Sequence, residues 1–327
     1  MKNIFFTTLL LSLVISCREV QKDVPDDDVS EAPKKPRIAG PEFNSDSAYS
    51  NIKIQVEFGP RVPGTKPHTQ CRDFFIASLR RYGLQVETQS TPVTLPVTGK
   101  TAQLTNIFAS FHPERKDRIL LLAHWDTRPV ADMDNERKNE PIPGADDGGS
   151  GTGVLLEMAR ILQLKDPNIG VDFLLVDGED SGLNNGNSDT WCLGSQHWAR
   201  NKKPDYKPRF AILLDMVGGG NPVFPREGTS VEYAPFVVEK VWSAAARLGY
   251  GNIFTNDITG MTTDDHLFIN DPGNIPAIDI VHYNVRRQGY PEWHHKHSDN
   301  MDIIDPSTLA IVGAVLVDVI YNENPPL

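Results

Sequence analysis

Clusters of basic residues are missing from this sequence, and so are two common hydrolase motifs. Lysine and arginine number 32 against 43 acidic residues in the 327-residue chain, which gives a net charge of −11. Without a basic stripe to neutralise phosphates, a nucleic acid is not expected as a partner. Neither a zincin HExxH helix nor a GxSxG nucleophile elbow is present, so hydrolysis by a Ser-His-Asp triad is poorly supported.

Cysteine is also scarce, with Cys17, Cys71 and Cys192 as the three in the chain. The first ends an apolar run, MKNIFFTTLLLSLVISC, which is short for a membrane span and has the layout of an export signal. Because Cys17 follows a small residue where this run stops, residues 1–16 resemble a lipoprotein signal peptide, with Cys17 as the lipidated first mature residue. The alternative is an ordinary signal peptide with an incidental cysteine. Cys71 and Cys192 could pair in an oxidising compartment or remain two buried thiols.

Two regions of different composition follow. Residues 17–45 are rich in Asp, Glu, Lys, Pro and Ser and lack apolar periodicity, which predicts a flexible tether. In residues 46–327, short apolar runs alternate with amphipathic helical patterns. Strands are expected at 118–126, 171–180, 209–218 and 275–283, and helices at 68–83, 151–164, 234–249 and 306–322. This alternation predicts a single α/β catalytic domain whose central, mostly parallel mixed β-sheet is flanked by helices.

Three of the expected strands end at acidic residues or histidine. The residues at these ends are His124, Asp126, Glu179, Asp180 and Asp215. Because ligands of open α/β sheets gather at the carboxyl ends of the strands, these side chains are expected at one edge. Further His- and Asp-rich loops span 143–151, 261–268 and 291–300. Packing so many carboxylates together is costly without a cation, and Asp, Glu and His without nearby Cys suit a divalent metal, above all zinc.

The ordered set of these motifs resembles the zinc-dependent aminopeptidase superfamily. The shared motifs are AHWDTR, PGADDGGSG, DGED, LLDMVG, DDH and a terminal His-x-x-x-Asp. Within the superfamily, HWDTRP, WCLGSQHWA, LLDMVGGGNPVFPREG and DDHLF resemble the glutaminyl-peptide cyclotransferases, or glutaminyl cyclases. The resemblance covers roughly residues 47–327. It implies an enzyme with one zinc ion per chain that converts the N-terminal glutamine of peptides or proteins to pyroglutamate and ammonia.

The resemblance also implies roles for individual residues. The implied zinc ligands are Asp147, Asp180 and His295, and the implied catalytic carboxylates are Glu179, at the general acid/base position, Asp215 and Asp264. His124 and Asp126 match a pair that would ligate a second metal in two-zinc aminopeptidases. In single-zinc cyclases this pair would be supporting structure.

The sequence departs from the family pattern beside the zinc histidine. Relatives often have an aromatic residue directly before that histidine, whereas this chain has His294, with Trp293 one position further back. Both His294 and His295 are therefore candidate ligands, and the register favours His295. The candidates for the wall of a glutamine pocket are Trp191, Tyr290, Trp293 and His294, although Trp191 could instead pack in the core.

Two other functions remain open. A two-zinc aminopeptidase on the same fold would complete a second site with His124 and Asp215, while Asp147 bridges the ions and Glu179 activates water. A non-catalytic surface lipoprotein would be expected to lack Glu179 or a metal ligand, and none is missing. The chain is expected to be a monomer, exported and lipid-anchored in the bacterial cell envelope, and to contact the membrane through the anchor only.

Overall fold

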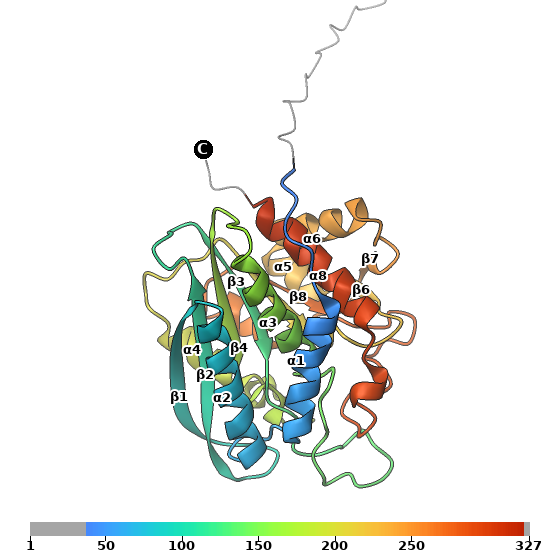
Figure 1. Cartoon of the computed structure of the whole chain (residues 1–327). Coiled ribbons are helices and arrows are strands. Elements are labelled where there is room, and N and C mark those ends of the chain that lie inside the picture. The colour runs from blue at the N-terminus through green and yellow to red at the C-terminus, as the bar shows by residue number, and fades with distance from the viewer. Residues whose placement is uncertain (1–36, 324–327) are drawn as a thin grey trace, which may run out of the picture. The chain divides into compact units, whose positions relative to one another are not determined.

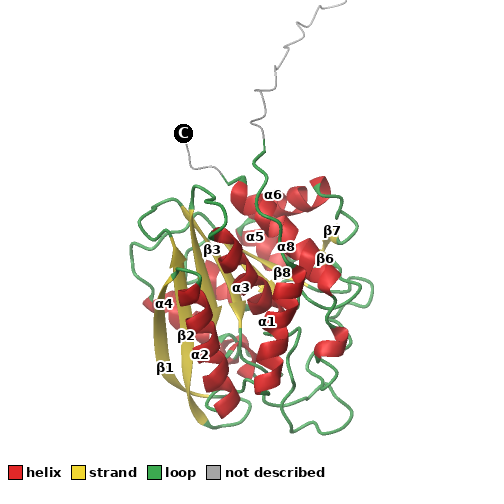
Figure 2. Cartoon of the chain, viewed as in Figure 1, coloured by secondary structure: helices red, strands yellow, loops and turns green. Residues whose placement is uncertain are grey.

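A six-stranded β-sheet forms the central layer of the domain. The computed structural model describes residues 37–323 (Figures 1 and 2), so the expected signal peptide and Cys17 lie outside the described residues. The strands are β1 (Gln85–Thr94), β2 (Thr101–Phe111), β3 (Arg118–His124), β4 (Gly170–Val176), β5 (Ala211–Asp215) and β8 (Ala277–Val281). They lie in the order β1-β2-β4-β3-β5-β8. The pairs β1/β2 and β2/β4 are antiparallel and the others are parallel, so β3, β4, β5 and β8 end at one edge.

The four parallel strands are buried along their whole length, as their continuous apolar sequences predict. Successive side chains of a strand point to opposite faces, and β3 supplies both cores in this way. Ile119, Leu121 and Ala123 enter one hydrophobic cluster, whereas Leu120 and Leu122 enter the other. The parallel half of the sheet is therefore packed between two layers of side chains.

Helices cover both faces of the sheet. On one face, α3 (Ser150–Leu162) packs on β3 and β5 and contacts α1 (Ser45–Phe58), α2 (Lys66–Arg81) and α8 (Pro306–Tyr321), which lie in front of the sheet in Figure 1. On the other, α4 (Leu193–Asn201) contacts β2, and α7 (Asp265–Asn270) contacts β5 and β8. The remaining elements are α5 (Gly228–Tyr233), α6 (Pro235–Arg247), β6 (Phe224–Arg226), β7 (Phe254–Ile258) and three 3₁₀ turns at Glu179–Ser181, Ser188–Thr190 and Met301–Ile303.

Close contact between α3 and the sheet depends on a glycine at the start of the helix. A Cβ atom on Gly151 would lie 2.3 Å from the carbonyl oxygen of Leu214 and 2.9 Å from the Cβ of Ala123. Only a residue without a side chain fits this approach. The PGADDGGSG segment therefore brings the loop that carries Asp147 directly against the ends of β3 and β5.

The folded unit begins within the segment that the sequence predicted as a flexible tether. Residues 38–44 of the expected tether contact the domain, where the backbone N–H of Ile38 donates to Asn322 Oδ1 at 2.8 Å, and the compact unit starts at Ile38.

Cys71 and Cys192 are both buried and free, so the disulfide alternative is wrong. Within the described range 37–323, every helix is too short or too polar to cross a membrane.

Candidate active site

A cavity of about 320 Å³ opens at the carboxyl edge of the parallel strands. Its acidic and histidine lining consists of Asp147, Glu179, Asp215, Asp264, His294 and His295. These side chains come from the loop before α3, the turn after β4, the end of β5, the N-cap of α7 and the loop before α8. The topology thus brings together five segments that are far apart in the sequence.

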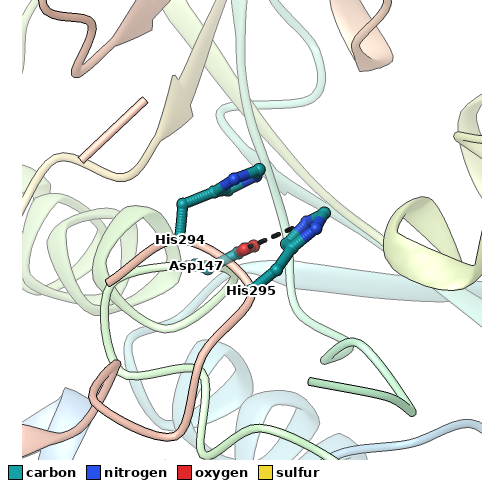
Figure 3. Close-up of side chains that lie close together, drawn as sticks. All are labelled: Asp147, His294 and His295. Carbon is teal, nitrogen blue, oxygen red and sulfur yellow. Dashed lines mark ion pairs between the residues drawn. The ribbon is translucent and has the colours of Figure 1, made fainter. Parts of the chain in front are cut away.

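His295 lies between two buried carboxylates. Its Nε2 atom is 3.2 Å from Asp180 Oδ1. The same atom is 3.8 Å from Asp147 Oδ2, a contact drawn in Figure 3. His294 stacks on His295 with ring centroids 3.6 Å apart, and it also presents a nitrogen near Asp147. Because His295 contacts both acids, the geometry favours it over His294 as the third member of a metal-binding group.

The chemistry of Asp147, Asp180 and His295 fits a zinc ion. Asp180 Oδ2 is buried and has no hydrogen-bond partner among the described residues, which is costly for a carboxylate unless a cation satisfies it. Burial lowers the pKa of His295 to about 4, so the imidazole is neutral and can donate its lone pair. Two carboxylates and one neutral imidazole supply oxygen and nitrogen donors that bind zinc, and three protein ligands is the number found in catalytic zinc sites.

A second group shares Asp147 with the first. His124 Nε2 lies 3.1 Å from Asp147 Oδ1 and 3.2 Å from Asp215 Oδ1. Burial alone would lower the pKa of His124, but the nearby carboxylates of Asp126, Asp147 and Asp215 raise it well above its usual range. Without a cation, the group is therefore held together by an imidazolium shared among acids.

Glu179 and Asp264 face each other on the cavity wall. One carboxylate oxygen of each lies within 4.8 Å of the other and of the Cys192 thiol. Burial, opposed by His124 and reinforced by Asp180 and Asp264, raises the pKa of Glu179 well above its usual range. Burial and the Asp215 charge likewise raise the pKa of Asp264 to about 7. Asp264 can therefore exchange a proton near neutral pH, and the upward shift of the Glu179 pKa is in the direction that a general acid/base requires.

Asp126 holds the backbone of the paired acids. Its Oδ1 accepts from the N–H of Glu179 at 3.0 Å and its Oδ2 accepts from the N–H of Asp180 at 3.2 Å. Asp299 holds the other acidic pair in the same way, since it accepts from the N–H groups of Asp146 at 2.7 Å and Asp147 at 3.1 Å. Both carboxylate oxygens of Asp126 therefore already accept hydrogen bonds from backbone amides. Asp126 is thus better suited to support the loop than to bind a metal.

Arg128 is a buried site residue that the sequence patterns did not single out. Its Nη1 donates to the carbonyl oxygens of Asp180 at 3.1 Å and Gly182 at 3.3 Å, and lies 3.5 Å from Asp180 Oδ1. Its guanidinium also lies over the Trp191 ring, 4.8 Å from the centroid. Arg128 therefore partly offsets the charge of Asp180 and braces the tryptophan.

Three of the four residues proposed for the pocket wall line the cavity, and one does not. Trp191, Tyr290 and His294 are in the lining, and the Trp191 ring lies parallel to His295 at 6.0 Å. Trp293 is absent from that lining in the described structure, because its indole N–H donates to Asp146 Oδ2 at 2.9 Å. The remaining lining residues lack a sequence signal and are Leu183, Asn184, Gly186, Asn187, Ser188, Met216 and Thr263.

Comparison with known proteins gives the family of this chain and several similar structures. Residues 106–320 match the family described as peptidase family M28. A solved glutaminyl cyclase from Bacteroides thetaiotaomicron, bound to N-acetylhistamine, is 45% identical, with a TM-score of 0.84 over 87% of this chain and 100% of that one. A leucine aminopeptidase precursor from the same species is 44% identical, with a TM-score of 0.83 over 88% and 100%. The glutaminyl-peptide cyclotransferase of Drosophila melanogaster is 24% identical over 81% of this chain and 77% of its own length.

Replacement of Asp126 by asparagine is expected to weaken metal binding. The amide NH₂ group cannot accept a hydrogen bond and would face the N–H of Glu179 or Asp180, so the loop that carries Asp180 should shift. We expect the affinity for Zn²⁺, measured by competition with a chromogenic chelator, to fall about 10- to 100-fold. The exposed Asp117→Asn should leave the affinity unchanged. Equal affinities for Asp126→Asn and wild type would contradict the supporting role of Asp126.

Proposed function

Because the chain belongs to peptidase family M28, we propose that it is a zinc-dependent glutaminyl cyclase, which converts the N-terminal glutamine of peptides to pyroglutamate with release of ammonia. The observation that carries the proposal is the pairing of Glu179 with Asp264 beside the metal-binding group. Cyclisation needs no protein nucleophile, but it needs one group that first accepts and then returns a proton. Similarity to the solved Bacteroides thetaiotaomicron cyclase supports glutamine as the substrate residue.

Asp147, Asp180 and His295 would hold the zinc ion. When bound, zinc supplies a Lewis acid that polarises the side-chain amide of the substrate and stabilises the negative charge on its oxygen. All three donors are buried side chains, and Asp147 and His295 also line the cavity, so an ion held by them would be reached from it. One ion per chain is sufficient for this chemistry.

The chain's own residues handle the proton and the substrate. The α-amine of the substrate attacks its own side-chain amide carbon, so a C–N bond forms in the ring and the bond to the amide nitrogen breaks. Glu179 accepts a proton from the α-amine and returns it to the departing nitrogen, which leaves as ammonia. Asp215 and Asp264 hold the amine near the carbonyl, and Trp191 with Tyr290 encloses the side chain, which makes proximity a large part of the rate enhancement.

A two-zinc aminopeptidase is the second candidate function. The observation that favours it is the His124, Asp147 and Asp215 group, whose ligand atoms all lie within 4.8 Å of one another. The similar leucine aminopeptidase precursor points in the same direction. Loss of the proton from His124 would free its nitrogen for a second ion.

We also propose that the protein is exported and anchored to the bacterial cell envelope as a monomer through a lipid on Cys17. The support is the apolar run that stops at Cys17. Replacement of Cys17 by alanine should move the protein from the membrane fraction to the soluble fraction after cell lysis, whereas Cys71→Ala should leave it with the membrane. A Cys17→Ala protein that still sediments with membranes would exclude this anchor.

The substrate and the metal can be tested in parallel assays of one preparation. We expect ammonia release from a Gln-initiated peptide, loss of activity with a chelator and recovery with Zn²⁺, and no leucine release from a leucyl peptide. Metal analysis should give one zinc per chain. Leucine release without ammonia release would reject the cyclase in favour of the aminopeptidase.

The two adjacent acids should respond differently to substitution. Glu179→Gln keeps the shape of the side chain and the zinc ligands, so zinc content should stay at the wild-type level while kcat falls by about 10²- to 10⁴-fold. Asp180→Ala removes a ligand, so zinc should be lost together with activity. Full activity of Glu179→Gln would show that another group moves the proton.

A further inference from the structure

We propose that Cys192 is a positioning residue for Glu179, because its thiol donates the hydrogen bond that orients the carboxylate of the proton shuttle. This inference rests on the proposed function of the site. Cys192 Sγ lies 3.4 Å from Glu179 Oε1. Within residues 37–323, the Cys192 thiol is the group that donates a hydrogen bond to the Glu179 side chain.

The backbone on both sides of this contact is paired, so the two side chains start from fixed points. The N–H of Cys192 donates to the carbonyl oxygen of Glu179 at 3.0 Å, and the N–H of Leu193 donates to that of Gly178 at 3.1 Å. The N–H of Glu179 is held by Asp126. The turn after β4 and the start of α4 are therefore joined at the residue that carries the proton.

Cys192 itself is held in an uncommon backbone conformation. Its φ of 55° and ψ of 37° are left-handed, which for a residue other than glycine requires support from its surroundings. That support includes the Ser195 hydroxyl and the Gln196 N–H, which both donate to the Cys192 carbonyl at 3.0 Å. The Cα–Cβ direction, and with it the position of the sulfur, is set by the backbone.

The surroundings also keep the thiol in its donor form. Burial and the charges of Glu179 and Asp265 raise the pKa of Cys192 well above its usual range, so the sulfur carries its proton at neutral pH. A thiol is a weak donor, so it can orient the Glu179 carboxylate without the strong hold of a charged partner. The charge of Asp264 repels the Glu179 carboxylate. The thiol selects the orientation in which Glu179 Oε1 stays fixed by the hydrogen bond while Oε2 faces the cavity.

Steady-state kinetics on a Gln-initiated peptide test the role with two matched variants of the full-length chain. Cys192→Ala removes the donor, whereas Cys192→Ser restores it with a hydroxyl on the same backbone. We expect kcat to fall about three- to tenfold in Cys192→Ala, with KM and zinc content unchanged, and to recover largely in Cys192→Ser. Cys71→Ala, which removes the other buried thiol, should leave kcat unchanged.

Other outcomes overturn the inference. An unchanged kcat in Cys192→Ala shows that the thiol does not position Glu179, and an equal loss in the alanine and serine variants shows a packing effect instead. If wild-type protein releases no ammonia, the proposed function fails, yet the hydrogen bond is still decided by infrared spectroscopy. The S–H stretching band of Cys192, assigned by its loss in Cys192→Ser, should shift to higher frequency in Glu179→Ala, and an unshifted band rejects the contact.

Discussion

Two buried carboxylates that each bind two successive backbone amides determine the geometry of the site. Asp126 fixes the turn of Glu179 and Asp180, and Asp299 fixes the turn of Asp146 and Asp147. Each such hydrogen bond to a charged group contributes about 1.5–3 kcal/mol, enough to hold a turn against the repulsion of the acids that it carries. The ligand positions are therefore set by the backbone before any metal binds, which lowers the cost of ordering the site on binding.

The same crowding divides the acids into two kinds. Asp147 lies beside His124, and although burial opposes the effect, the hydrogen bond between them lowers the pKa of Asp147. Asp264 lies near His266, but burial and the Asp215 charge outweigh the lowering effect of that histidine and raise the pKa of Asp264 to about 7. One carboxylate thus stays ionised and can bind a cation, while the other can carry a proton at physiological pH. This division supplies a metal ligand and a proton carrier from a single residue type.

The sequence predicted the parts of the fold and site that depend on local pattern. The continuous apolar runs located β3, β4, β5 and β8, and Glu179 and Asp215 after β4 and at the end of β5 line one cavity, because parallel strands end together. The β1/β2 pair was not predicted, since β1 is polar and mostly exposed and lacks a strand signature. Other contacts of the site were not predicted, namely the hydrogen bonds of Asp126 and Asp299 to backbone amides and the hydrogen bond of the Cys192 thiol. They join residues 13 to 153 positions apart, and no local sequence spacing encodes such contacts. The hydrogen bond of Trp293 to Asp146 is of the same kind, because the two residues lie 147 positions apart.

Three carboxylates surround the imidazole of His124 at the end of β3. His124 contacts Asp126, Asp147 and Asp215, and these acids require a positive charge among them. A proton on His124, which its raised pKa favours, supplies that charge and occupies the nitrogen lone pair that a second ion would use. Without that proton, the nitrogen that faces Asp147 and Asp215 would be free to bind a cation. The two proposed functions therefore differ in which cation these acids would hold.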